Sequence, residues 1–197
     1  MYEMIKLNYD YKELEPYYNK DMFYYHYFVL YKKYTENLNN IMNEFINDRK
    51  NKNYENIQSL EERLSFNANA YMLHSLFFEN LTPYKTNLSK ELINHINKDF
   101  TSYDAFTNEL NSAIMNIQGP GWVIFGYNMI LDKLLIIQVE NHMDQILIDF
   151  IPLLVIDVWE HSYYLQYKTD KDKYRENLLN ILNFNVVSDR YNKIYLI

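Results

Sequence analysis

The 197-residue sequence contains no cysteine, only three glycines and only four prolines. Without cysteine the chain can form no disulfide framework, zinc ribbon or thiol nucleophile, so any bound metal must be held by nitrogen and oxygen atoms. The glycines, at positions 119, 121 and 126, are too few to build a phosphate-binding loop or a dinucleotide fingerprint. The composition therefore argues against enzymes that depend on a bound nucleotide.

A basic stripe and a long apolar run are also missing. The formal net charge is −7, and acidic and basic residues are interspersed, so the chain lacks the surface that follows a phosphate backbone. No apolar run approaches the roughly 20 residues that span a bilayer, and the first residues, MYEMIKLNYDYKE, lack the apolar core of a signal peptide. We therefore expect no nucleic-acid partner, no membrane association and a cytoplasmic location.

The first part of the chain has the hydrophobic periodicity of helices. Apolar residues recur at spacings of three and four over residues 20–47 and 55–80, which predicts two long amphipathic helices. The short polar stretch NDRKNKNYEN between them makes the two helices antiparallel neighbours. Pro83 cannot continue the second helix, so we place the end of an N-terminal hairpin domain there, at residues 1–83.

In the rest of the chain, residues 84–197, the sequence pattern changes from that of helices to that of strands and then back to that of helices. Two shorter helical patterns, at residues 89–100 and 102–117, end at a break, QGPG. Three β-branched and aromatic runs of strand length follow, GWVIFGYN, KLLIIQVEN and IPLLVIDVW. Helical spacing then returns in DKYRENLLNILNF and VSDRYNKIY. This order predicts an α+β fold, in which the antiparallel helical hairpin packs on a C-terminal domain with a small three-stranded antiparallel sheet flanked by helices.

Five histidines are the first candidates for metal ligands: His26, His74, His95, His142 and His161. An antiparallel hairpin brings His26 and His74 to facing positions near its open end, a common place for a metal site. Asp157 and His161, four residues apart in DVWEHSYY, could supply two more ligands, or they could form an ordinary surface pair. The carboxylate that ends IPLLVID would be buried and would need a partner or a metal. Three imidazoles and one carboxylate suit iron, manganese or zinc.

The block DVWEHSYYLQYK, at residues 157–168, resembles the signature Asp-x-Trp-Glu-His-Ala-Tyr-Tyr of the iron/manganese superoxide dismutases. The likeness continues in order through almost the whole chain, in NYDYKELEP, HYFVLYKKYTENLN, FNANAYMLHSLFFENLTP, GPGWVIFGYN and NFNVVSDRY. The resemblance implies a superoxide dismutase that converts superoxide to dioxygen and hydrogen peroxide by redox cycling of one iron or manganese ion per subunit. It also implies that the ion lies between the two domains and that its ligands are His26, His74, Asp157 and His161.

The resemblance assigns roles to further side chains around the ligands. Tyr34 matches the family's gateway tyrosine, and it lies two helical turns after His26 on the expected helix, so its hydroxyl can approach the solvent ligand of the metal. His142 falls where manganese-type members carry a glutamine that hydrogen-bonds this solvent. Iron-type members supply that glutamine from the position of Ala70, so this chain lacks it. We expect His142 to tune the redox potential, while the choice between iron and manganese stays open.

The spare acid of the signature implies an assembly of subunits. Glu160 matches the glutamate that, in the family, reaches across a dimer interface to the ligand histidine of the other subunit, and Tyr164 accompanies it there. The expected state is therefore a homodimer or a tetramer, because both contain this interface. Trp159 and Trp122 match residues that wall the metal pocket.

Three positions depart from the family pattern. Leu30 stands where the family often has a relay histidine, and Phe78 and Ile124 replace tryptophans of the pocket. A noncatalytic dimeric homologue of the same fold is therefore an alternative, and a zinc hydrolase is a weaker one because the surroundings are aromatic. Since the net charge would repel superoxide, three lysines are candidates for attracting the substrate: Lys32, Lys33 and Lys168.

Overall fold

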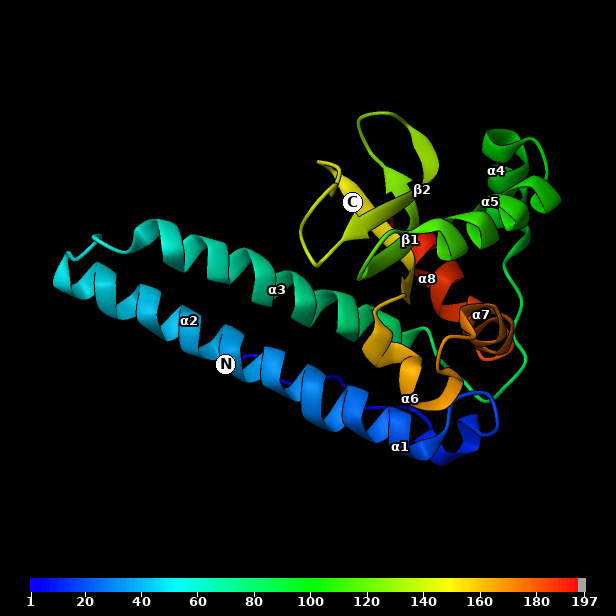
Figure 1. Cartoon of the computed structure of the whole chain (residues 1–197). Coiled ribbons are helices and arrows are strands. Elements are labelled where there is room, and N and C mark those ends of the chain that lie inside the picture. Colours follow the sequence, from blue (N-terminus) through cyan, green and yellow to red (C-terminus); the bar gives the residue numbers. More distant parts are fainter. Residues whose placement is uncertain (195–197) are drawn as a thin grey trace.

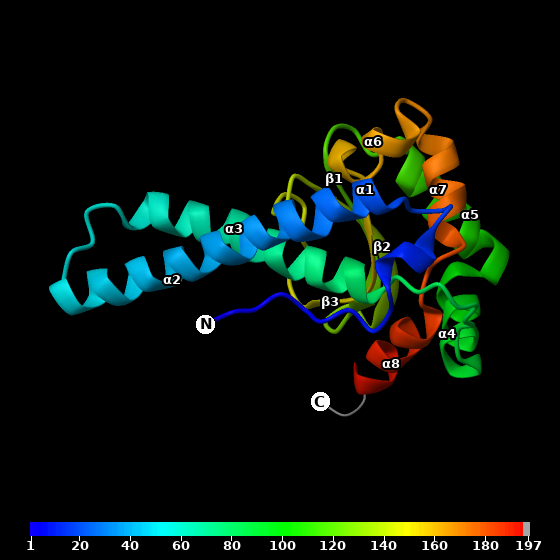
Figure 2. The same ribbon diagram turned by 90° about the horizontal axis from the view of Figure 1, so that it is seen from below.

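The computed structural model describes residues 1–194 and consists of a long helical hairpin attached to a mixed domain (Figure 1). The hairpin is formed by consecutive elements: η1 (Tyr11–Leu14), α1 (Lys20–Phe23), η2 (Tyr24–Tyr31), α2 (Lys32–Asn51) and α3 (Ile57–Glu79). α2 and α3 run side by side and project away from the sheet in both views (Figures 1 and 2). The expected hairpin is therefore present, and its open end is the end that contacts the rest of the molecule.

The mixed domain contains one sheet and helices on either side of it in the chain. Its elements are α4 (Lys90–Phe100), α5 (Tyr103–Asn116), β1 (Gly121–Asn128), β2 (Lys133–Glu140), β3 (Phe150–Asp157), η3 (Glu160–Ser162), α6 (Tyr164–Tyr167), α7 (Lys171–Leu179) and α8 (Phe184–Ile194). The three strands are antiparallel in the order β2-β1-β3. The predicted α+β fold class is confirmed. The last residue of the expected helix at 187–195 lies outside the described residues.

The helix boundaries follow local capping chemistry. Each of Asn19, Ser89 and Ser102 precedes a helix, and its side-chain oxygen accepts a hydrogen bond from a backbone N–H of the first turn, as N-caps do. α2 ends at Asn51, and the next residue, Lys52, adopts a left-handed conformation with φ of 52°. These signals explain why the sequence pattern located most of the elements within a few residues.

The first long helix differs from the regular α-helix that the periodicity predicts. Residues 24–31 form a π-helix, in which backbone N–H groups bond to the carbonyl five residues earlier rather than four. Each π turn takes up more residues than an α turn. His26 and Tyr34 are therefore not separated by the two regular α-helical turns that the periodicity predicts. π-helical segments are rare and occur frequently at functional sites. This one carries His26.

The core extends across both parts of the molecule, and the sheet register sets the position of one acid. Buried residues of η2, the end of α3 and all three strands belong to one apolar cluster, while Ile41, Phe45 and Leu60 form a small second cluster in the outer hairpin. β1 is buried along its whole length, and its register with β3 pairs Trp122 with Asp157. The carboxylate at the end of β3 thus lies beside an indole, at the edge of the sheet that faces the hairpin.

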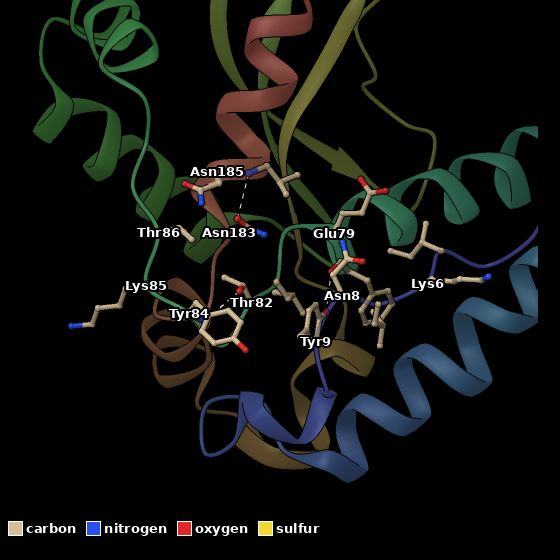
Figure 3. A pocket seen from close by; sticks show the side chains of 15 residues that line it. Lys6, Asn8, Tyr9, Glu79, Thr82, Tyr84, Lys85, Thr86, Asn183 and Asn185 are labelled. Carbon is tan, nitrogen blue, oxygen red and sulfur yellow. Dashed lines mark hydrogen bonds between the residues drawn. The ribbon is translucent and has the colours of Figure 1, made fainter.

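Two further observations concern the surface. Among the described residues, no helix combines the length and the apolar composition needed to cross a membrane. A cavity of about 330 Å³ lies between the N-terminal segment, the end of α3 and the start of α8 (Figure 3). Asn8, Thr82 and Asn183 contribute to its lining, whereas Lys6 and Lys85 extend outward at its sides (Figure 3). This cavity is a feature of the junction between the two parts of the chain.

Candidate metal centre

Four side chains that are far apart in the sequence converge where the open end of the hairpin meets the sheet. They are His26, His74, Asp157 and His161. One potential ligand atom from each lies within 4.8 Å of those of the others. The side chains of the first three are fully buried, and that of His161 is 19% exposed. The geometry thus brings together all four residues that the sequence singled out.

Each of the four candidate ligands comes from a different element. His26 lies in η2, His74 lies in α3 near its C-terminal end, and Asp157 is the last residue of β3. His161 follows in the short helix η3. Two ligands therefore come from the hairpin and two from the segment that leaves the sheet.

The three Nε2 atoms face the Asp157 carboxylate, which is the hydrogen-bond partner of His161 Nε2. The Nε2 atoms of His26 and His161 each lie 3.1 Å from Asp157 Oδ2, and that of His74 lies 3.8 Å away. The Nε2 atoms of His26 and His74 are buried and make no hydrogen bond within residues 1–194. Leaving such a group unsatisfied costs about 1–3 kcal/mol, so natural proteins rarely do so without a function. A nitrogen-and-oxygen site with three imidazoles and one carboxylate fits iron or manganese.

The opposite sides of these ligands are held by hydrogen bonds. His74 Nδ1 donates to the Ala70 carbonyl at 2.6 Å, which leaves the lone pair on Nε2, the atom that faces the cluster. His26 Nδ1 lies 2.7 Å from the Tyr18 hydroxyl. Asp157 Oδ1 accepts from the Trp159 backbone N–H at 2.8 Å, so Oδ2 is the oxygen that is turned toward the three imidazoles.

The electrostatics keep the donor set in the protonation state that a metal requires. Burial lowers the pKa of His26 to about 4, although the Asp157 carboxylate opposes the shift, and burial lowers the pKa of His74 well below its ordinary value. Burial works against ionisation of Asp157, but the facing imidazoles of His161 and His26 outweigh it and hold the pKa of this carboxyl below its usual range. At neutral pH His26 and His74 are therefore neutral, and the Asp157 carboxylate is ionised.

This arrangement makes the metal-free protein sensitive to mild acid. The unfolded chain protonates His26 near pH 6.5, whereas the folded chain does so only near 4, so unfolding takes up a proton between these values. Stability is therefore fully present above about pH 6.5 and is lost as the pH falls toward 4. For His26 alone the loss between pH 7 and pH 5 is about 2 kcal/mol, and His142, whose pKa burial also lowers to about 4, adds to it.

Urea unfolding of chelator-stripped protein at the two pH values measures this loss. A His26→Gln variant, which cannot take up this proton, is expected to show a smaller difference between the two curves. Equal stability of the wild-type chain at pH 7 and pH 5 would show that the buried imidazoles do not make the protein sensitive to acid in this range.

Tyr34 and His142 meet beside the cluster. The Tyr34 hydroxyl lies 3.3 Å from His142 Nε2, and the Tyr34 ring centroid lies 5.1 Å from that of His74. Trp122 Nε1 donates to His142 Nδ1 at 3.0 Å. An indole N–H is only a donor, so Nδ1 of His142 carries no proton; the neutral ring therefore carries it on Nε2 and donates it to Tyr34 Oη. The tautomer of His142 follows from this one contact.

Aromatic rings enclose the cluster on several sides. Trp122 packs edge-on to His74 at 4.9 Å between centroids, and Trp159 stacks on both His142 and His161 at 4.5 and 5.4 Å. Phe78, at the position of a family tryptophan, lies 4.8 Å from the His26 ring. Ile124 is buried in β1, two residues beyond Trp122 and on the same face of the strand.

The remaining predicted residues lie on the surface near His161. Glu160 is exposed and Tyr164 is 48% exposed. These two residues share a surface hollow of about 630 Å³ with Leu30 and His161. The three lysines named as candidates for attracting the substrate, Lys32, Lys33 and Lys168, are all exposed. Lys32 pairs with Glu36 at 3.7 Å, and the Lys168 ammonium lies over the Tyr164 ring.

Comparison with known proteins assigns the chain to a family. Residues 1–82 match the family model described as iron/manganese superoxide dismutases, alpha-hairpin domain, and residues 88–190 match the model of the C-terminal domain. The chain belongs to the iron/manganese superoxide dismutase family. The family predicted from the signature at residues 157–168 is confirmed.

Curated relatives carry names with either metal. The chain is 35% identical to "Superoxide dismutase [Mn], mitochondrial" of Glossina morsitans morsitans, over 94% of this chain and 87% of the relative. It is 34% identical to "Superoxide dismutase [Fe]" of Pyrobaculum aerophilum, over 98% and 92% of the two chains. It is 30% identical to "Superoxide dismutase [Mn/Fe]" of Aeropyrum pernix, over 96% and 90%. As a member of this family the chain is an oxidoreductase, and its cofactor is iron or manganese.

Sequence reasoning missed several residues that touch the site, among them Tyr18 and Phe66. Tyr18 hydrogen-bonds His26, and Phe66 packs edge-on to His142 at 4.7 Å between ring centroids. Phe66 lies eight residues before His74 on α3, a helical spacing that could have indicated it, whereas the contact of Tyr18 depends on how separate elements pack. The only signal for Tyr18 was its place two residues before the first long helix, in a chain with 21 tyrosines.

Proposed function

We propose that this protein dismutates superoxide with one iron or manganese ion held by His26, His74, Asp157 and His161. The observation that carries the proposal is the convergence of three imidazole nitrogens on one carboxylate oxygen, two of these nitrogens being buried without a hydrogen bond. Iron or manganese held by these residues would supply one-electron redox chemistry, through which two superoxide ions and two protons would give dioxygen and hydrogen peroxide. The protein holds the ligands, excludes bulk water and manages protons.

Tyr34 is the proton-bearing group next to the cluster. Burial and the nearby Asp157 carboxylate raise the pKa of Tyr34 to about 12, so its phenol stays protonated at neutral pH. Since His142 Nε2–H donates to Tyr34 Oη, the hydroxyl hydrogen of Tyr34 is directed elsewhere than toward His142. It is available to a small anion that reaches the cluster.

The two-domain division of the chain, at residues 1–83 and 84–197, belongs to the same proposal. The ligands support it, because two come from the hairpin and two from the C-terminal part, so the ion lies between the two domains. The cytoplasmic location and the absence of nucleic-acid and membrane partners stay predictions, which cell fractionation tests.

We also propose a dimer, or a tetramer built from that dimer, in which Glu160 contacts His161 of the other subunit. The features that support it are the exposure of Glu160, the partial exposure of the buried cluster through His161, and the apolar side chains around the hollow. Tyr25, 56% exposed, and Leu165, 45% exposed, are among these side chains. An interface there would cover apolar area that a monomer leaves in water.

Superoxide consumption by chelator-stripped protein reloaded with iron or with manganese tests the activity. We expect turnover with at least one ion and none in the stripped protein. Stable binding of both ions without turnover would favour the noncatalytic homologue that Leu30 suggests. Hydrolase activity after loading with zinc alone would favour the other alternative.

Replacing His142 with glutamine should change which metal supports activity. A glutamine amide can accept from Trp122 Nε1 and donate to Tyr34, so it preserves both hydrogen bonds while altering their geometry. We expect the ratio of manganese-dependent to iron-dependent turnover to change by about tenfold, the lower range for an outer hydrogen-bond partner. An unchanged ratio in the two reloaded forms would remove His142 as the residue that tunes the metal.

A further inference from the structure

Tyr18 is a fully buried phenol that touches a metal ligand. It lies directly before Asn19, the N-cap of α1, and its hydroxyl is 2.7 Å from Nδ1 of His26. Its ring packs edge-on to Phe23, with 6.0 Å between centroids, and against Phe77 at 6.5 Å. The phenol is therefore held in place by packing, and its oxygen is presented to one side of the His26 ring.

Nε2 is the nitrogen of His26 that faces the cluster. The position of the proton in the contact with Tyr18 determines whether Nε2 has a lone pair or carries a hydrogen. A neutral imidazole has one N–H and one acceptor nitrogen. If Tyr18 donates to Nδ1, then Nε2 carries the hydrogen and points an N–H at the cluster, where it cannot ligate a metal. If Nδ1–H donates to Tyr18 Oη, then Nε2 has the lone pair and is a ligand.

We propose that Tyr18 is a positioning residue that accepts the Nδ1–H hydrogen bond of His26, fixes the ligating tautomer and orients Nε2 toward the metal. The inference rests on the proposed function, because it takes His26 as a ligand. It adds a determinant of metal retention that lies outside the signature at residues 157–168. His74 obtains the same control from a backbone carbonyl, which no substitution removes, whereas at His26 the control is a replaceable side chain.

The chain offers a matched control for this role in Tyr9. Tyr18 is buried and Tyr9 is half-buried, and both pack edge-on to the same ring, that of Phe23, at 6.0 Å for Tyr18 and 6.5 Å for Tyr9. The Tyr9 hydroxyl donates to the Phe78 backbone carbonyl at 3.0 Å and does not touch a ligand imidazole. Tyr18→Phe and Tyr9→Phe thus each remove one tyrosine hydroxyl and one hydrogen bond, but only the first removes the partner of His26.

The experiment measures cobalt(II) binding by chelator competition in the wild type and both variants, together with the visible absorption of the loaded proteins. We expect Tyr18→Phe to lower the affinity by about 10–100-fold and to shift the cobalt bands, because the His26 ring is no longer held in one orientation. Tyr9→Phe should keep the wild-type spectrum and an affinity within about twofold. Urea unfolding of the three metal-free proteins shows how much stability each hydroxyl contributes.

Each of the other outcomes would reject either the role of Tyr18 or the proposed function. Wild-type affinity and spectrum in Tyr18→Phe would overturn the role of Tyr18 while leaving the ligand set intact. An equal loss of affinity in both variants would show a general effect of losing a tyrosine hydroxyl beside Phe23, and it would overturn the role as well. A wild-type protein that binds no cobalt, iron or manganese would reject the proposed function itself.

Discussion

His161→Ala protein is expected to be purified almost without metal, with an affinity for iron or manganese more than about 100-fold below that of the wild type. Loss of an outer hydrogen-bond partner already costs up to about 100-fold, and this change removes a ligand. It also removes one of the two imidazoles that hold the pKa of the Asp157 carboxyl down. Metal content by mass spectrometry, and chelator competition, measure the effect.

His95→Ala is the matched control for this change. His95 and Asp99 form the same i, i+4 pair as His161 and Asp157, and the Nε2–Oδ2 distance is also 3.1 Å. The His95 pair lies on α4, outside the four-ligand cluster, so its loss should leave the metal content unchanged. If His161→Ala retains one equivalent of metal, or if both variants lose it equally, His161 is not a specific ligand.

Replacing Glu160 with alanine is expected to weaken the subunit contact and the metal site together. Truncating one member of a buried, hydrogen-bonded charged pair at an interface costs about 2 kcal/mol or more, which is roughly 30-fold in the dissociation constant of the dimer. In the proposed dimer, His161 of the other subunit would then lose the acceptor that orients it, which would cost about 10–100-fold in metal affinity. Analytical ultracentrifugation over a dilution series and metal analysis of the same samples measure the two effects.

Glu62→Ala provides the comparison for Glu160, because Glu62 is an exposed glutamate on α3 that accepts a hydrogen bond from Gln58 and lies outside the ligand cluster. It should change neither quantity. A Glu160→Ala protein that remains a dimer with full metal would eliminate the contact between subunits. A monomeric wild type at micromolar concentration would eliminate the assembly itself.

Much of the fold was predictable because its determinants are local. The uninterrupted three-and-four periodicity before Pro83 defines the hairpin, and β-branched runs after QGPG define the strands. The buried carboxylate at the end of β3 was predictable too, since the residues before it are all apolar. The signature at residues 157–168 supplied the family, and with it the roles that spacing alone leaves open.

Other features were out of reach because they arise from packing between distant segments. Nothing in the periodicity of residues 20–47 distinguishes the π-helical segment from a regular α-helix, and the same residues satisfy both patterns. The pairing of Trp122 with Asp157 depends on the register of β1 and β3, which alternation within each strand does not determine. The contact of Tyr18 with His26 depends on how the chain enters α1.

The division of the ligands between the two ends of the chain has a consequence for biosynthesis. A ribosome delivers His26 and His74 early, but Asp157 and His161 leave it only when most of the polypeptide has been made. Since sites of this kind rarely exist before the chain is folded, the nascent hairpin offers two imidazoles and no complete cage. With the proposed ligand set, a complete metal cage therefore requires that the C-terminal part of the chain has been made and folded against the hairpin.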